Sequence, residues 1–141
     1  MIKTHGEHLG VLLLVAALCS SAMATEENAR QGRWKADKEI NGQKVSMNIE
    51  ITKDQFVFRM KNDADEVRLF AKGQIKVEKL GPFKTLTLQD IQGGASEDNL
   101  QVVDETRAFV YATGWKTLTL AGNFDREREN QEPDLTVYRK E

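Results

Sequence analysis

Hydrophobic and polar side chains alternate along most of the chain beyond residue 30. The alternation is cleanest at residues 45–52, where Val, Met, Ile and Ile are separated by Ser, Asn, Glu and Thr. A period of two is typical of a β-strand with one buried face. Asn41-Gly42, just before this segment, indicates a tight hairpin, because both residues tolerate the positive φ of a type I′ turn. The pattern therefore predicts a hairpin between strands at residues 33–40 and 45–52.

The same alternation continues to the C-terminus and is interrupted by turn residues. Lys53-Asp54, Asn62–Asp65 and Gly81-Pro82 have the composition of chain reversals. Gly73 interrupts a long alternating segment and indicates a bulge or bend within that strand. Further strands are expected at residues 56–61, 66–78, 83–91, 107–113, 115–121 and 135–139.

Eight expected strands and no useful amphipathic helix predict an all-β fold. Short strands joined by hairpins favour an eight-stranded up-and-down antiparallel barrel, since closure removes the exposed edges that invite aggregation. A two-sheet β-sandwich is the alternative. The residues expected to face inward are Val45, Met47, Ile49, Ile51, Phe56, Phe58, Met60, Leu69, Leu86, Leu88, Leu118, Leu120 and Val137.

Barrels of eight strands are either filled by their own side chains or hold one small ligand. The inward residues here are mostly large, so we expect a mostly packed interior with at most a small pocket near one mouth. Phe56, Phe58 and Met60 would suit an apolar ligand such as an acyl chain, and ordinary core packing is the alternative interpretation.

Residues 107–113 are apolar on both faces of the predicted strand. We expect Phe109 and Tyr111 to point inward and to join the candidate ligand site, with the smaller residues outside. Otherwise these aromatic residues would form an exposed patch with Phe70. Such a patch would mark a protein partner or a homodimer interface.

The first 24 residues have the pattern of an export signal. Lys3 is a basic N-terminal residue, Leu9–Leu18 is an apolar run too short to span a bilayer, and Ala22-Met23-Ala24 is a small-x-small cleavage sequence. We therefore expect residues 25–141 to form a single exported domain, periplasmic or secreted, with no transmembrane segment.

Cleavage after residue 24 would remove His5, His8 and Cys19, which are all the histidines and cysteines of the chain. The remaining domain would then have no Ser-His-Asp or Cys-His site and no thiolate or imidazole metal ligand, so we expect neither enzyme activity nor a cofactor. Lipid anchoring through Cys19 is the alternative; Leu18 disfavours it, because such signals carry a small residue there. A net charge of −2 does not favour nucleic acid as a partner.

Two segments at opposite ends of the domain, Gly32-Arg33-Trp34 and Thr136-Val137-Tyr138-Arg139, resemble the signature of lipocalins and other calycins. In these families Gly-x-Trp begins the first strand, and an arginine from the final strand packs across the indole at the closed end of the barrel. The resemblance implies that Gly32, Trp34 and Arg139 form a structural plug. A guanidinium over a tryptophan ring contributes about 0.5–2 kcal/mol.

More narrowly, the chain resembles small lipocalin-like domains of exported bacterial proteins, including an uncharacterised planctomycete family. The matching segments are residues 32–35, 40–45, 107–111, 115–120 and 135–139. The resemblance implies no defined ligand. The sequence thus predicts a non-catalytic binding module for a small apolar or amphipathic molecule. A structural or protein-interaction domain with a solid barrel is the alternative.

Overall fold

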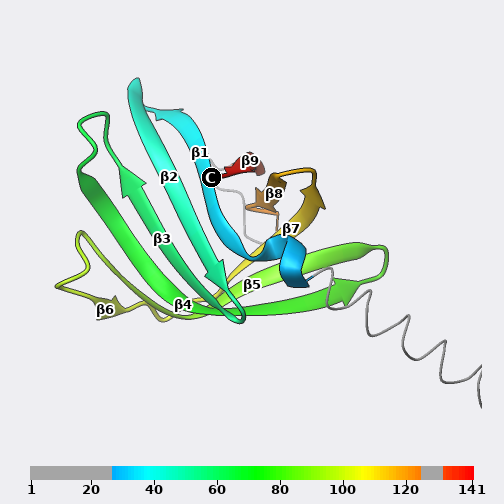
Figure 1. The fold of residues 1–141 in the computed structure, drawn as a ribbon. Coiled ribbons are helices and arrows are strands. Elements are labelled where there is room, and N and C mark those ends of the chain that lie inside the picture. Colours follow the sequence, from blue (N-terminus) through cyan, green and yellow to red (C-terminus); the bar gives the residue numbers. More distant parts are fainter. Residues whose placement is uncertain (1–26, 125–131) are drawn as a thin grey trace, which may run out of the picture. The chain divides into compact units, whose positions relative to one another are not determined.

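The computed structural model describes residues 27–124 and 132–141. Two units are distinguished, residues 1–30 and 31–141. In the first unit, residues 27–30 form one helical turn. The predicted leader, with Cys19, lies outside the described residues. The second unit contains all nine strands found in the described part of the chain (Figure 1).

These strands form an antiparallel barrel. Their bounds are β1 (Gly32–Ile40), β2 (Gln43–Thr52), β3 (Gln55–Lys61), β4 (Val67–Leu80), β5 (Phe83–Gly94), β6 (Gln101–Val102), β7 (Arg107–Gly114), β8 (Thr117–Gly122) and β9 (Asp134–Lys140). Eight of them follow the order β4-β3-β2-β1-β9-β8-β7-β5, and pairing of β4 with β5 closes the barrel. The short strand β6 pairs with β5 only. The eight-stranded up-and-down barrel is therefore confirmed, and the sandwich alternative is wrong.

The first hairpin has the predicted turn. Ile40 pairs with Gln43, and the two residues between them, Asn41 and Gly42, have φ values of 52° and 79°. Both values lie in the left-handed region that a type I′ turn requires. The local sequence thus determines where β1 ends and β2 begins.

An irregularity occurs at Gly73, but the bulge lies in the opposite strand and not, as the sequence predicts, in the strand that carries the glycine. Lys72 pairs with Gln92 whereas Gln74 pairs with Gln89, so β5 contains one more residue than β4 at this point. Asp90, within the extra stretch, has a φ of 50°. The additional residue therefore belongs to β5 and not to the strand that carries the glycine.

The bulge changes which residues of β5 face the interior. Leu86 and Leu88 alternate before it, whereas after it the buried residue is Ile91, an odd-numbered position. An inserted residue reverses the parity of every side chain beyond it. A single apolar stripe inside the barrel is thereby maintained along the whole of β5.

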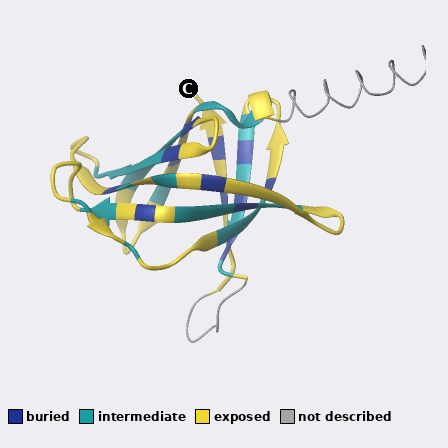
Figure 2. Ribbon diagram, turned by 90° about the horizontal axis from the view of Figure 1, so that it is seen from below, coloured by how far each residue is buried: buried dark blue, intermediate teal, exposed yellow. Residues whose placement is uncertain are grey.

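The core occupies the barrel interior, and Figure 2 shows buried positions as isolated bands along the strands. Ten of the thirteen predicted inward residues belong to or pack against this core, and Val45, Leu69 and Val137 do not. Val137 is 44% exposed, while its neighbours Thr136 and Tyr138 are buried. The predicted parity of the last strand is thus wrong. Threonine and tyrosine occupy the inner face of β9, and two aliphatic residues, Leu135 and Val137, occupy its outer face.

Phe109 and Tyr111 point inward as predicted, since Tyr111 belongs to the core cluster and Phe109 packs against it. Phe70 is also buried, but it lies outside this cluster, with the Arg59 guanidinium 5.2 Å from the centroid of its ring. The alternative of an exposed aromatic patch including Phe70 is therefore wrong. Trp115, predicted to begin a strand, instead lies in the turn before Thr117 and is 87% exposed.

Candidate functional site

Trp34 is buried near the start of β1. The Lys140 ammonium lies over its indole as a cation–π partner, with Nζ 5.7 Å from the ring centroid. Arg139, the residue predicted for this role, pairs across the sheet with Lys35, whereas Lys140 pairs with Trp34. Directly opposed residues share one face of a sheet, so register assigns the contact to Lys140 and directs Arg139 to the other face.

Gly32 contributes to the same end of the barrel. Its φ is 124°, and a Cβ on this residue would lie 3.2 Å from Cε of Lys140. The aliphatic part of the lysine therefore passes over the glycine on its way to the indole. Gly32, Trp34 and Lys140 thus lie together at this end of the barrel.

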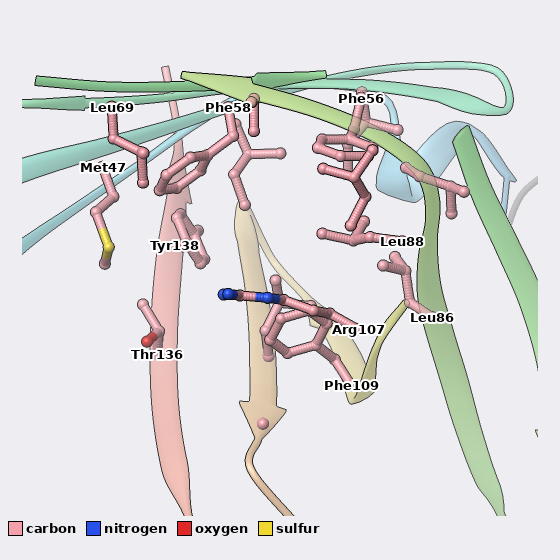
Figure 3. A pocket seen from close by; sticks show the side chains of 18 of the residues that line it. Met47, Phe56, Phe58, Leu69, Leu86, Leu88, Arg107, Phe109, Thr136 and Tyr138 are labelled. Atoms are coloured by element: carbon pink, nitrogen blue, oxygen red, sulfur yellow. The ribbon is translucent and has the colours of Figure 1, made fainter. Parts of the chain in front are cut away.

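A cavity of about 360 Å³ opens at the opposite end of the barrel (Figure 3). Its outer lining comes from the strand ends that meet there, namely the end of β1, the start of β4, the end of β5, the start of β7, the end of β8 and the start of β9. The volume falls within the range of about 300–1,000 Å³ typical of small-molecule sites.

This cavity is larger than the small pocket expected from the sequence. Gly93, Gly94, Gly122 and Ala71 all line it. Positions without a side chain, or with only a methyl group, leave space that the large inward residues do not fill. Phe109 is held close to the wall for the same reason: a Cβ on Gly122 would lie 2.9 Å from the phenylalanine ring.

Three of the five predicted ligand-binding residues line the cavity: Phe56, Phe58 and Phe109. Met60 packs against the core and Tyr111 is buried within it, but neither is part of the lining. The remaining apolar lining residues are Met47, Ile49, Ile51, Leu69, Phe70, Ala71, Ile75, Leu86, Leu88, Ile91, Val103 and Leu120.

Five polar residues line the cavity that were not among the predicted site residues: Lys38, Arg107, Asp134, Thr136 and Tyr138. A signal for two of them was present. Lys38 has the parity of Trp34 and Ala36, and Arg107 has the parity of Phe109 and Tyr111. A charged residue that continues an inward stripe is the expected mark of a barrel mouth, where the interior meets water.

Lys38 is held by two residues of β9. Its Nζ donates hydrogen bonds to both carboxylate oxygens of Asp134, at 2.8 and 2.6 Å, and to Oγ1 of Thr136 at 2.9 Å. The side chain of Lys38 is 30% exposed and that of Asp134 51%. This cluster ties β1 to β9 at the open end and balances one positive charge with one negative charge.

Arg107 begins β7 and is the second cation among the described residues of the lining. Its Nη2 lies 3.4 Å from Oε1 of Glu105, in a pair with both side chains substantially exposed. Figure 3 shows the guanidinium extending from the side of Phe109 into the cavity, toward Tyr138 and Thr136. A positive charge thus projects into an otherwise mainly apolar space.

Tyr138 is a hydrogen-bond donor at neutral pH. Burial raises the pKa of its phenol to about 12, and the negative charge of Asp134 contributes in the same direction. Its hydroxyl therefore keeps its proton under all physiological conditions. It supplies a polar group to a wall formed largely by aliphatic and aromatic side chains.

The acidic turn between β3 and β4 is organised by the side chain of Asn62. Oδ1 of Asn62 accepts hydrogen bonds from the backbone N–H groups of Ala64 and Glu66, at 3.1 and 2.9 Å.

Across residues 27–124 and 132–141, no group of three or more His, Cys, Asp or Glu side chains gathers as a metal site would require. Within those same ranges, no helix is long and apolar enough to span a membrane.

No known protein family, curated protein or solved structure matches this chain.

Proposed function

We propose that this protein is a non-catalytic binding module that holds a small apolar or amphipathic molecule inside its barrel. The observation that carries the proposal is the mainly apolar cavity of about 360 Å³ at the open end. A solid barrel would have no such space. The pattern of residues 1–24 supports a site of action after export, in the periplasm or outside the cell.

The chemistry of the lining supports this assignment. Ligand sites in proteins are mostly apolar cavities with a few polar groups at defined positions. Here aromatic and aliphatic side chains form the interior, and the polar groups are concentrated at the mouth. The likeness of Gly32-Arg33-Trp34 to lipocalin-like domains points in the same direction.

A protein-interaction role is the second candidate, favoured by apolar residues exposed on hairpin turns. Leu80 and Phe83 flank the β4–β5 turn and are 65% and 58% exposed, and Trp115 is 87% exposed. Large exposed apolar side chains that cluster are typical of interfaces. This role would depend on the hairpin turns and not on the cavity, so substitutions separate the two candidates.

The test is titration with N-phenyl-1-naphthylamine, an uncharged apolar dye that fluoresces when it leaves water. We expect saturable binding of one dye per chain. Leu88→Trp places an indole in the cavity and should weaken binding at least ten-fold. Leu80→Trp, the matched control, adds the same bulk at an exposed turn and should leave binding unchanged.

Two results would contradict the proposal. One is the absence of saturable dye binding to the unsubstituted protein, and the other is equal affinity in Leu88→Trp. If the protein binds no dye and instead self-associates in a manner that Leu80→Ala and Phe83→Ala abolish, the second candidate is supported. Sedimentation velocity measures that self-association.

A further inference from the structure

Two basic residues and one acidic residue are found in the described part of the cavity lining. Among the described residues, the charged members of the lining are Lys38, Arg107 and Asp134. The lysine and the aspartate are joined by two hydrogen bonds, at 2.6 and 2.8 Å, and neutralise each other. Among the described lining residues, Arg107 is therefore the cation without an acidic partner in the lining itself; its ion pair is with Glu105, which is not a lining residue.

The position of Arg107 is set by the sheet. It pairs directly with Leu88 of β5, which also lines the cavity, and it shares its parity with Phe109. Opposed residues and alternate residues along a strand lie on one face. The strand pairing thus directs the guanidinium inward, and Figure 3 shows it projecting between Phe109 and Tyr138.

The contact with Glu105 leaves Arg107 able to bind a second group. It involves a single nitrogen, Nη2, at 3.4 Å, and the two side chains are 58% and 39% exposed. A guanidinium carries five N–H donors in a planar fork, and its preferred partners are carboxylate and phosphate groups, which it binds through two parallel hydrogen bonds.

Two further donors line the cavity. The Thr136 hydroxyl accepts a hydrogen bond from Lys38 at 2.9 Å and keeps its own proton for donation. Tyr138 keeps its phenolic proton at neutral pH, as shown above. Both residues line the cavity on the side toward which Arg107 extends (Figure 3).

We propose that the ligand of this cavity is an amphipathic anion, an apolar chain with a carboxylate or another oxyanion at one end. Arg107 binds the anionic group at the mouth, and Tyr138 and Thr136 donate hydrogen bonds to it. The chain enters the space between Phe56, Ile75 and Leu86. This inference rests on the proposed function, and it adds the charge of the ligand and its orientation in the barrel.

The experiment is calorimetric titration at pH 8 with four probes of equal chain length: dodecanoate, dodecyl phosphate, dodecanol and dodecyltrimethylammonium, each below its micellar concentration. We expect one or both anions to bind at least ten-fold more tightly than the alcohol and the cation to bind most weakly. The tighter anion identifies the preferred head group. Arg107→Gln should reduce the affinity for that anion to the level of dodecanol.

Arg68→Gln is the matched control. Arg68 is also a substantially exposed arginine paired with a glutamate two residues earlier, with 3.1 Å between Arg68 Nη2 and Glu66 Oε2, but it is not part of the lining. The Arg68→Gln variant should bind every probe with the affinity of the unsubstituted protein. Unchanged dodecanol affinity in Arg107→Gln shows that the variant retains its fold and its cavity.

Equal affinity for the anions and dodecanol, or an anion affinity that Arg107→Gln does not lower, would overturn this inference and leave the proposed function standing. Failure of all four probes to bind would overturn both. Arg107→Lys is a graded check, because it keeps the charge but loses the planar fork. Its affinity for the preferred anion should lie between those of the unsubstituted protein and Arg107→Gln.

Discussion

The residue that covers Trp34 illustrates how neighbouring positions in a strand differ in role. Arg139 and Lys140 are adjacent cations, yet Lys140 is the one of the two that pairs with Trp34 and has its charge over the indole ring. Its stem also passes over Gly32, where a Cβ would lie 3.2 Å from Cε. The contact with the indole therefore depends on the second of two similar residues.

Alanine substitutions at these two positions should separate their roles. Lys140→Ala is expected to lower the free energy of unfolding by about 0.5–1 kcal/mol, because it removes a partly exposed cation–π contact. Arg139→Ala should change it by less than about 0.5 kcal/mol, as surface substitutions usually do. Urea denaturation followed by tryptophan fluorescence measures both. A larger loss in Arg139→Ala would contradict the assignment.

A second prediction at this scale concerns Tyr138 at alkaline pH. Its pKa is about 12 in the folded protein against an ordinary value of 10.0. As the pH rises through this interval the unfolded chain loses the phenolic proton first. The free energy of unfolding that the protonated Tyr138 contributes is therefore fully present below pH 10 and is lost progressively toward pH 12. The total loss is about 2–3 kcal/mol, since one pKa unit corresponds to about 1.4 kcal/mol.

Denaturant unfolding between pH 8 and 11.5 measures this dependence. The Tyr138→Phe variant lacks the titrating group, so its stability should fall less steeply above pH 10 than that of the unsubstituted protein. Lysine titration is common to both and cancels in the difference. Parallel curves would show that the phenol is not protected by the fold.

At the scale of elements, β5 shows how one extra residue preserves an apolar stripe. The bulge at Asp90 brings Ile91 inward after Leu86 and Leu88, and Gly73 on β4 makes room for it. A Cβ at Gly73 would lie 2.7 Å from the backbone oxygen of Gln89 and 2.9 Å from the ring of Phe56. Both neighbours belong to rigid parts of the barrel.

Gly73→Ala should therefore lower the free energy of unfolding by about 1–3 kcal/mol, the range typical of overpacking. Gly93→Ala is the control, because its nearest contacts would be ordinary ones at 3.5 Å. That variant should be neutral or slightly stabilising, since alanine loses less conformational entropy than glycine on folding. Thermal and urea unfolding of the two variants give the comparison, and equal stabilities would argue against a tight site at Gly73.

At the scale of the whole molecule, pairing of β4 with β5 closes the barrel, and the cavity opens at the end opposite to Trp34. A ligand that binds only the closed barrel stabilises it by mass action. At a free concentration one hundred times its dissociation constant, it should raise the free energy of unfolding by about 2.7 kcal/mol.

This stabilisation is predicted for the unsubstituted protein and for Leu80→Trp, with N-phenyl-1-naphthylamine as the ligand. Leu88→Trp should show almost none at the same dye concentration, because the indole occupies part of the cavity. Denaturant unfolding with and without dye provides the measurement. Equal stabilisation of all three proteins would place the dye outside the barrel.

Local rules were sufficient for much of this architecture. The positions of the strands follow from a period of two, and the first turn follows from the positive φ that Asn41 and Gly42 tolerate. The irregularity at Gly73 and the inward aromatic residues of β7 were also predictable. Each of these features depends on residues close together in the sequence, so the information lies within one segment or one hairpin.

The faces of β9, the choice of cation over Trp34 and the cavity depend on pairing between distant segments. The register of β9 against β1 and β8 places Tyr138 inside and Val137 outside, and selects Lys140 over Arg139. A slip of one residue would exchange these faces, and β9 has plausible inward residues on both parities. The cavity is likewise a property of the closed barrel: its volume is what remains after side chains from eight strands have filled the interior, and small residues on β4, β5 and β8 leave that space open.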